Sequence, residues 1–310
     1  MNKLLSFFLL ISISISFHAQ VKLNEASNAN GTAFLQANGS TPDWIELFNS
    51  SANITNLQGL YLSDSKSNLS KWAFPPLSLA PNGFTTLLAN GNGSSYLVNH
   101  FESPINTQAI WTYNVPNNNI ANWTALGFDD SNWSTGKMGV GYGDSDDSTT
   151  VPGPLTTIYA RIDFTISNFN DIVKAVLDID YDDGFVAYLN GVEVARAGLS
   201  GTPPNFDELA TDHEAQLYQG GNVSSFDLDM SVLGNLLQNG NNVFAIEIHN
   251  SSATSSDLTC RPFLAFGMAS AQQQYNGYIH PYFVNNIAGT IETNFSIATE
   301  GETIYLSDAN

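Results

Sequence analysis

Five polar side chains lie in segments that otherwise have the alternating apolar pattern of β-strands: Arg161, Asp178, Asp180, Glu247 and His249. Every even position of residues 158–166 is apolar, as is every odd position of 173–181 and every even position of 243–249 up to Ile248. Because side chains alternate between the two faces of a strand, all five polar residues belong to the faces that point away from the core. If the three strands share one sheet, these side chains gather on its outer face. Such a group could hydrogen-bond the hydroxyls of a sugar, or it could be a solvated face with cross-strand ion pairs.

A run of aspartates suggests a different chemistry. Asp182 and Asp183 follow two earlier aspartates and precede Gly184, and hard cations such as Ca²⁺ require several oxygen ligands. The spacing differs from that of an EF-hand loop, because the glycine comes one position late and no glutamate closes the loop. Asp144, Asp146 and Asp147 form a second acidic loop. A structural Ca²⁺ is therefore the one cofactor that the sequence suggests, with Asp182 and Asp183 as candidate ligands.

Motifs of common catalytic sites are missing from the sequence. It contains no Gly-x-Ser-x-Gly elbow, no His-Glu-x-x-His, no phosphate-binding loop and no histidines at metal-binding spacing. Carboxylate pairs are numerous in so acidic a chain, so composition leaves a glycosidase pair open. We expect the chain to have no enzymatic activity of its own.

The charge balance limits the partners. Twenty-nine acidic residues against nine basic ones give a formal net charge of −20, which repels nucleic acids and anionic membranes. A glycan or a cell-surface polymer is compatible with this charge, and acidity by itself also favours solubility. Cys260 is the one cysteine, so no intramolecular disulfide can form and stability must come from burial.

The first residues have the pattern of an export signal. Lys3 precedes an apolar stretch from Leu4 to Phe17, and the small residue Ala19 follows it. The stretch is shorter than the ~20 apolar residues that a membrane-spanning helix needs, and no later segment is that long. We therefore expect a signal peptide at 1–19 and a protein that is secreted or held at the cell surface, without membrane insertion.

The remaining chain is predicted to be almost entirely β. Short apolar runs with period-2 alternation are separated by turn residues, and only residues 230–237 show weak helical periodicity. Asn190-Gly191 between two apolar runs predicts a type I′ hairpin, and Asp183-Gly184 predicts a similar turn. The expected strands are 21–24, 44–49, 60–63, 71–74, 84–88, 158–166, 173–181, 185–189, 192–196 and 243–249.

These strands group into modules joined by looser segments. We expect a first module at 20–98, a linker at 99–109, a second module at 110–270 and a linker at 271–292. Tyr305–Asp308 repeats the tetrapeptide Tyr-Leu-Ser-Asp of Tyr61–Asp64. Either the repeat is a chance recurrence, or a second copy of the first module begins at 293–310, which is the alternative we expect.

Ordered motifs of the first module resemble those of a lamin-tail domain, an immunoglobulin-like β-sandwich. They cover about a quarter of the chain and consist of Leu-Asn-Glu-Ala at 23–26, Asp-Trp-Ile-Glu-Leu-Phe-Asn at 43–49, Leu-Gln-Gly-Leu-Tyr-Leu-Ser-Asp at 57–64 and Lys-Trp-Ala-Phe-Pro at 71–75. The resemblance implies adhesion, surface display or an accessory role beside secreted enzymes, with no shared catalytic residues.

The second module resembles a galactose-binding-like jelly roll of secreted bacterial proteins. The resemblance covers about half of the chain and lies in residues 128–133, 139–143, 159–164, 182–191, 242–249 and 255–258. It implies a β-sandwich that binds carbohydrate in some members and often holds a structural Ca²⁺. The tandem also resembles the N-terminal part of larger secreted proteins that carry a spore-coat-H-like kinase or a phosphoesterase domain.

Together these patterns predict an all-β protein with an Ig-like β-sandwich, a β jelly roll and a partial third β-module. The predicted function is non-catalytic binding or adhesion outside the cell, with carbohydrate as the expected ligand. Two alternatives stay open: an accessory region of a larger secreted enzyme, and a structural spacer.

Overall fold

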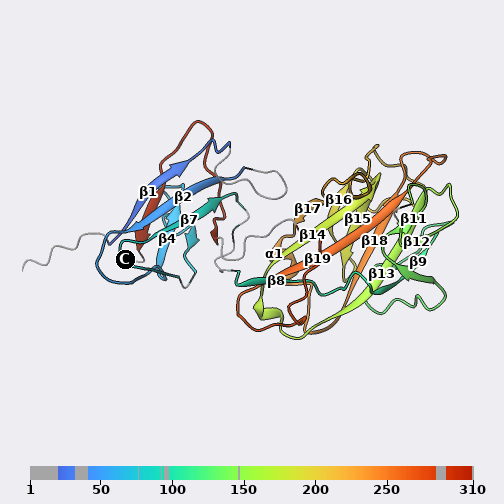
Figure 1. The fold of residues 1–310 in the computed structure, drawn as a ribbon, viewed down its shortest axis with the longest axis horizontal. Coiled ribbons are helices and arrows are strands. Elements are labelled where there is room, and N and C mark those ends of the chain that lie inside the picture. Colours follow the sequence, from blue (N-terminus) through green and yellow to red (C-terminus); the bar gives the residue numbers. More distant parts are fainter. Residues whose placement is uncertain are drawn as a thin grey trace, which may run out of the picture.

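The computed structural model describes residues 20–31, 41–75, 77–91, 93, 98–145, 147–283 and 291–308. Its secondary structure is almost entirely β, as predicted, and it forms two lobes (Figure 1). The expected signal peptide at 1–19 lies outside the described residues. Within the described ranges, no helix has the length and apolar character needed to cross a membrane.

The larger lobe contains a six-stranded antiparallel sheet that faces a four-stranded antiparallel sheet (Figure 1). In spatial order the first is β10 (Ser134–Lys137), β9 (Ile110–Asn114), β13 (Thr157–Ile166), β18 (Gly240–His249), β15 (Gly184–Leu189) and β16 (Val192–Ala197). The second is β17 (Ser224–Asp227), β14 (Ile172–Asp182), β19 (Thr259–Met268) and β8 (His100–Glu102). The parallel pair β11 (Val140–Gly141) and β12 (Thr149–Thr150), the 3₁₀ turns Phe169–Asp171 and Leu217–Gln219, and the short helix α1 (Met230–Leu233) complete this lobe.

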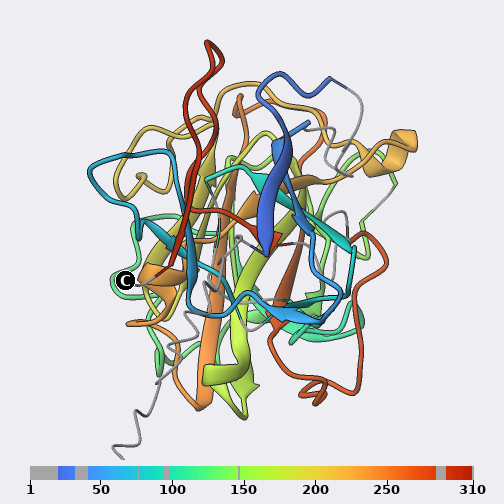
Figure 2. The same cartoon turned by 90° about the vertical axis from the view of Figure 1, so that its left-hand side faces the viewer.

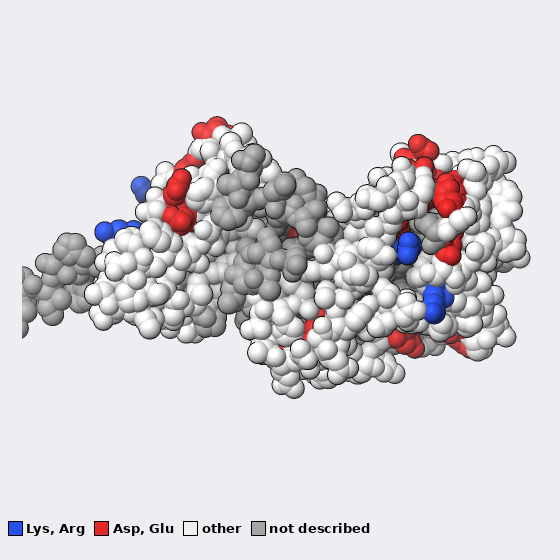
Figure 3. Space-filling view, viewed as in Figure 1, with Lys and Arg blue, Asp and Glu red and all other residues white. Residues whose placement is uncertain are grey.

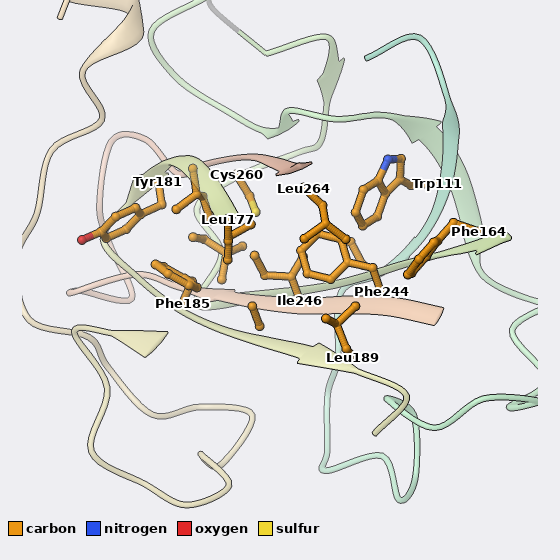
Figure 4. Close-up of a cluster of buried hydrophobic side chains, with 14 of the residues drawn as sticks. Trp111, Phe164, Leu177, Tyr181, Phe185, Leu189, Phe244, Ile246, Cys260 and Leu264 are labelled. Carbon is orange, nitrogen blue, oxygen red and sulfur yellow. The ribbon is translucent and has the colours of Figure 1, made fainter. Parts of the chain in front are cut away.

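The core of the larger lobe lies between these two sheets (Figure 4). The apolar even positions of β13 point into it, and Phe244 and Ile246 of β18 join them, which confirms the face assignment made from the sequence. Cys260 is buried in the same core, and this burial raises the pKa of its thiol, so the thiol is uncharged at neutral pH.

Two turns that look alike in the sequence have different structures. Asn190 and Gly191 have φ of 48° and 88°, which confirms the predicted hairpin between β15 and β16. The hairpin expected at Asp183-Gly184 was wrong, because β14 belongs to the four-stranded sheet and β15 to the six-stranded one. Asp183 is the one residue between these strands, and Gly184 is needed for space: a Cβ there would lie 2.6 Å from the Cβ of Ala210.

The smaller lobe packs short sheets around a second core. Its four-stranded sheet has the order β1 (Val21–Ser27), β2 (Asp43–Asn49), β7 (Phe84–Ala89) and β20 (Ile291–Glu292). A three-stranded sheet contains β21 (Tyr305–Asp308), β4 (Leu60–Ser63) and β5 (Trp72–Ala73), and β3 (Thr55–Asn56) pairs with β6 (Ser78–Leu79).

The C-terminal strands of the described chain belong to this smaller lobe, beside the N-terminal strands (Figure 2). This differs from the separate third module that we expected at 293–310. The repeated tetrapeptide explains the difference, since its two copies pair with each other: Leu306 lies opposite Leu62, and Tyr305 opposite Ser63. Ile291 of β20 and the following Phe295 are buried in the core of this lobe.

The two expected linkers also contribute to the folded lobes. β8, within 99–109, pairs with β19, and the buried carboxylate of Glu102 accepts hydrogen bonds from the backbone N–H groups of Gln274, Tyr275 and Gly277. Residues 271–283 are therefore tied to the larger lobe.

Burial of Ile291 predicts that the C-terminal strands stabilise the smaller lobe. Ile291→Ala should lower the free energy of unfolding of this lobe by about 2–5 kcal/mol, because Ile291 is 1% exposed. The matched control is Ile54→Ala, since Ile54 is 72% exposed in the same lobe and its truncation should cost less than about 0.5 kcal/mol. Urea denaturation measures both. Equal effects of the two substitutions would contradict this placement of β20.

Candidate functional site

The structure brings together three of the five predicted binding residues. Arg161 on β13 and Glu247 and His249 on the neighbouring β18 all lie on the outer face of the six-stranded sheet. All three are buried, because loops cover this face. The prediction that Asp178 and Asp180 share it was wrong: they lie on β14 in the other sheet.

Asp178 and Asp180 instead fix loops against the four-stranded sheet. Oδ2 of Asp178 lies 3.3 Å from Nε2 of His280, whose ring stacks on Phe263. Oδ1 of Asp180 accepts a hydrogen bond of 2.7 Å from the backbone N–H of Gln216. Both carboxylates are buried against these partners, so they do not form a cluster with Arg161.

Arg161 holds the loop that covers the outer face. Its Nε lies 2.9 Å from Oδ2 of Asp130, and its Nη1 donates to the carbonyl oxygen of Trp123 at 2.6 Å. The guanidinium also lies over the ring of Phe128, 5.2 Å from its centroid. One side chain thus attaches three points of the segment between β9 and β10 to the sheet.

Glu247 lies at the centre of a buried hydrogen-bond network. Its Oε1 accepts from the hydroxyl of Tyr188, and its Oε2 lies 3.1 Å from Nε2 of His249. Nδ1 of His249 lies 2.8 Å from the carbonyl oxygen of Glu208 and 3.1 Å from Oγ1 of Thr157. These contacts fix the carboxylate and the imidazole in one orientation.

Glu247 also lines a pocket of about 720 Å³ on this face. Its mouth lies between two loops, which are joined where Asn119 Nδ2 donates to Asn205 Oδ1 at 3.1 Å. Asn119 Oδ1 in turn accepts from the backbone N–H of Phe206 at 2.7 Å. The pocket is lined by Asn119 to Thr124, Tyr159, Tyr188, Gly191, Glu193, Pro203 to Asn205 and Glu247.

Two aromatic side chains of the lining bring polar atoms that the protein leaves unpaired. Trp123 and Tyr159 are 7% and 2% exposed, and their rings stack 4.3 Å apart. In the part of the chain that the structure describes, neither the Trp123 indole N–H nor the Tyr159 hydroxyl forms a hydrogen bond with the protein. Burial and the charge of Glu247 raise the pKa of Tyr159, so its hydroxyl remains a donor. Neither atom is among the fully buried polar atoms without a partner, so both donors are open to a ligand or to water in the pocket.

Sequence reasoning found Glu247 but missed the aromatic residues around it. Tyr159 and Tyr188 could have been found, because Tyr159 shares the outward parity of Arg161 and Tyr188 lies on a predicted strand. Trp123 lies in a loop, where no periodic pattern predicts which way a side chain points.

A separate acidic cluster is the place where a cation could bind. Carboxylate oxygens of Asp144, Glu214 and Asp257 lie within 4.8 Å of one another. On the face shown in Figure 3, acidic side chains gather at the end of the larger lobe that carries β11 and β12. Of the two candidate ligands predicted from the sequence, Asp182 is buried close enough to this cluster for its charges to act on it.

Both carboxylate oxygens of Asp183, the other candidate ligand, accept hydrogen bonds from backbone N–H groups. Its Oδ1 accepts from the N–H of His213 at 2.8 Å, and its Oδ2 accepts from the N–H of Ser251 at 2.6 Å. It therefore joins two loops. Asp146 of the second acidic loop lies outside the described residues, and Asp147 accepts from Thr259 Oγ1 at 2.5 Å.

No protein-family model matches the chain, and no curated protein matches its sequence. Solved structures with a similar arrangement include a β-glycosidase from Bacteroides vulgatus, with 13% identity over 53% of this chain and 20% of that one, at a TM-score of 0.34. A family 2 glycosyl hydrolase from Bacteroides cellulosilyticus matches with 15% identity over 54% of this chain and 20% of its own, at 0.35. A β-glucuronidase from an uncultured Clostridium matches with 12% identity over 55% and 29%, at 0.33.

This chain thus spans between a fifth and a third of the length of those enzymes. Likeness at this level defines neither a family nor a function. The resemblances to lamin-tail and galactose-binding-like domains stay predictions.

Burial of Asp182 predicts a measurable pH dependence. Burial first, and then the charges of Asp183, Asp257 and Glu214, raise the pKa of Asp182 from 3.8 to about 8. The unfolded chain loses this proton near pH 4 and the folded chain only near pH 8, so the free energy of unfolding should fall across that interval. Asp182→Asn should remove much of this fall and stabilise the protein at pH 8 by a few kcal/mol.

Urea denaturation at several pH values between these limits measures the effect. Asp212→Asn, at an exposed aspartate, is the control and should leave the pH dependence unchanged. An Asp182→Asn variant whose stability follows pH as the wild type does would contradict the burial argument.

Proposed function

We propose that this protein binds carbohydrate without catalysing a reaction, and that it does so outside the cell. The proposed binding site is the pocket over the outer face of the six-stranded sheet. One observation supports it above all: two aromatic side chains of the pocket lining, Trp123 and Tyr159, have donors that form no hydrogen bond within the described chain, beside the buried carboxylate of Glu247.

This arrangement is complementary to a sugar hydroxyl, which both donates and accepts hydrogen bonds. The hydroxyl can donate to Glu247, whose two oxygens each keep a lone pair after contacting Tyr188 and His249. It can accept from Tyr159 or from the indole N–H of Trp123. A hydrogen bond to a charged group contributes about 1.5–3 kcal/mol, so a few such contacts support a specific, moderate affinity.

Both carboxylates of the pocket lining are held in place by neighbouring side chains. Glu193 is held by Arg196, with Nε and Nη2 each 2.5 Å from a carboxylate oxygen, and Glu247 is held by Tyr188 and His249. Fixed carboxylates of this kind are good hydrogen-bond acceptors. We therefore propose that Glu193 and Glu247 accept hydrogen bonds from a ligand and do not act as the acid and nucleophile of a glycosidase.

We further propose that Ca²⁺ has a structural role in this protein. Asp144, Glu214 and Asp257 supply hard oxygen ligands of the kind that Ca²⁺ prefers. None of these three residues lines the pocket. Calcium should therefore raise the stability of the larger lobe without changing which sugar is bound.

A glycan microarray probed with and without Ca²⁺ tests the proposed function. At least one glycan should be bound in both conditions, while Ca²⁺ raises the melting temperature alone. Tyr159→Phe should then weaken binding of that glycan about tenfold, the effect of one lost hydrogen bond. Its stability should stay within about 0.5 kcal/mol of the wild type, because the hydroxyl forms no hydrogen bond within the described chain.

The matched control is Tyr278→Phe. The Tyr278 hydroxyl accepts from the backbone N–H of Thr107 at 3.1 Å, away from the pocket lining. Its removal should cost about 1 kcal/mol of stability and leave glycan binding unchanged. The proposal fails if no glycan is bound, or if Tyr159→Phe binds as tightly as the wild type.

A further inference from the structure

The charges next to the pocket are arranged in pairs. Glu193, the carboxylate on its β16 side, forms a two-point ion pair with Arg196. On the other side, Arg161 forms an ion pair with Asp130 beneath the covering loop. Each pair has no net charge, so the net charge of the pocket depends on Glu247.

The contacts of His249 fix the charge of the pair that it forms with Glu247. Nδ1 of His249 faces the carbonyl oxygen of Glu208, which can only accept, so this nitrogen carries a hydrogen. The Thr157 hydroxyl, its other neighbour, already donates to the carbonyl oxygen of Phe206 and can only accept from Nδ1.

One more proton must therefore lie between Nε2 of His249 and Oε2 of Glu247. Without it, two lone pairs would face each other at 3.1 Å in a buried site. If the proton is on the imidazole, the pair is a cation beside an anion; if it is on the carboxyl, both groups are neutral. In either case the Glu247–His249 pair has no net charge.

We infer that the ligand of this pocket is an uncharged sugar, neither a uronic acid nor an amino sugar with a free ammonium group. This inference rests on the proposed function and narrows it. No Lys, Arg or His is among the residues that line the pocket, so a ligand carboxylate would find no cation there. An ammonium group would have to compete with His249 for Glu247 and with Arg196 for Glu193.

The cost of removing a charged ligand from water strengthens the preference for an uncharged sugar. Moving an ionised group from water into a pocket without a free counter-charge is strongly unfavourable, whereas a hydroxyl exchanges its hydrogen bonds with water for those of the pocket. The Trp123 indole, the Tyr159 hydroxyl and the Glu247 carboxylate supply those bonds. The net charge of −20 adds long-range repulsion of anionic ligands but would attract cationic ones. Amino sugars are therefore the critical comparison.

Titration calorimetry with three classes of probe tests the inference. The neutral probes are cello-, manno-, xylo- and galacto-oligosaccharides of equal length; the charged ones are oligogalacturonate and fully deacetylated chito-oligosaccharide. We expect at least one neutral probe to bind with an affinity that changes less than about twofold between ~0.02 M and ~0.3 M salt. Both charged probes should bind at least about tenfold more weakly, and any attraction of the amino sugar should disappear in salt.

Arg196→Gln provides the matching variant, because it removes the counter-charge of Glu193. It should raise the affinity for the deacetylated chito-oligosaccharide, relative to that for the neutral probes, about tenfold at low salt. Thermal melting tests whether the variant is folded. The comparison of the three classes of probe on the wild-type protein does not depend on the variant.

Three results are distinguishable. Preference for a neutral probe supports the inference. If a charged probe binds more tightly than every neutral one and Tyr159→Phe weakens that binding, the inference is overturned while carbohydrate binding stands. If no probe of any class binds, the proposed function and this inference both fail.

Discussion

The contact between Arg161 and the loop above it makes the outer face of the six-stranded sheet a buried interface. A guanidinium is rarely buried, because its desolvation is offset only when its donors are paired. Here Asp130 supplies a carboxylate, Trp123 a carbonyl oxygen and Phe128 an aromatic face. The loop is thereby held against the sheet, and the features of the pocket depend on its position.

Burial on both faces distinguishes the central strands of this sheet from those of a sandwich with one solvated face. Apolar side chains of β13, β15 and β18 fill the core between the sheets, while outward-facing side chains such as Tyr159, Tyr188 and Glu247 are buried under loops. The outward-facing Asp163 and Thr165 at the end of β13 are exposed. Polar groups at the buried outward positions cannot rely on bulk water. Glu247 and His249 pair with each other, whereas the Tyr159 hydroxyl lines the pocket and forms no hydrogen bond within the described chain. The same burial that requires internal pairing thus leaves a pocket whose carboxylates, Glu193 and Glu247, are both paired.

Local patterns predicted the parts of this structure that depend on neighbouring residues in the chain. Alternation located β13, β14 and β18 with the correct inward faces, and Asn190-Gly191 located a hairpin, because both signals act over a few residues. β19 was missed because nearly all of its residues are buried and it contains Pro262, so neither alternation nor composition marks it as a strand.

Strand pairings between distant parts of the chain could not be predicted from the sequence. The single residue Asp183 between β14 and β15 looks like a tight turn, yet the chain changes sheets there, and this separates Asp178 and Asp180 from Glu247. The return of residues 291–308 to the smaller lobe likewise depends on a partner strand more than two hundred residues earlier. The pocket is formed by a sheet face and a loop together. No periodic pattern in the sequence predicts which way the Trp123 side chain of this loop points.

Hydrogen exchange of the segment between β9 and β10 in Arg161→Ala tests the central claim most directly. The backbone N–H groups of Ala125, Phe128 and Trp133 are hydrogen-bonded within this segment, so they report whether it stays in place. Arg261→Ala is the control, because its guanidinium lies over Tyr282 on another part of the lobe. We predict faster exchange of these three amides in Arg161→Ala alone, with the amides of β18 still protected. Unchanged protection of this segment in Arg161→Ala would show that the loop does not depend on the buried guanidinium.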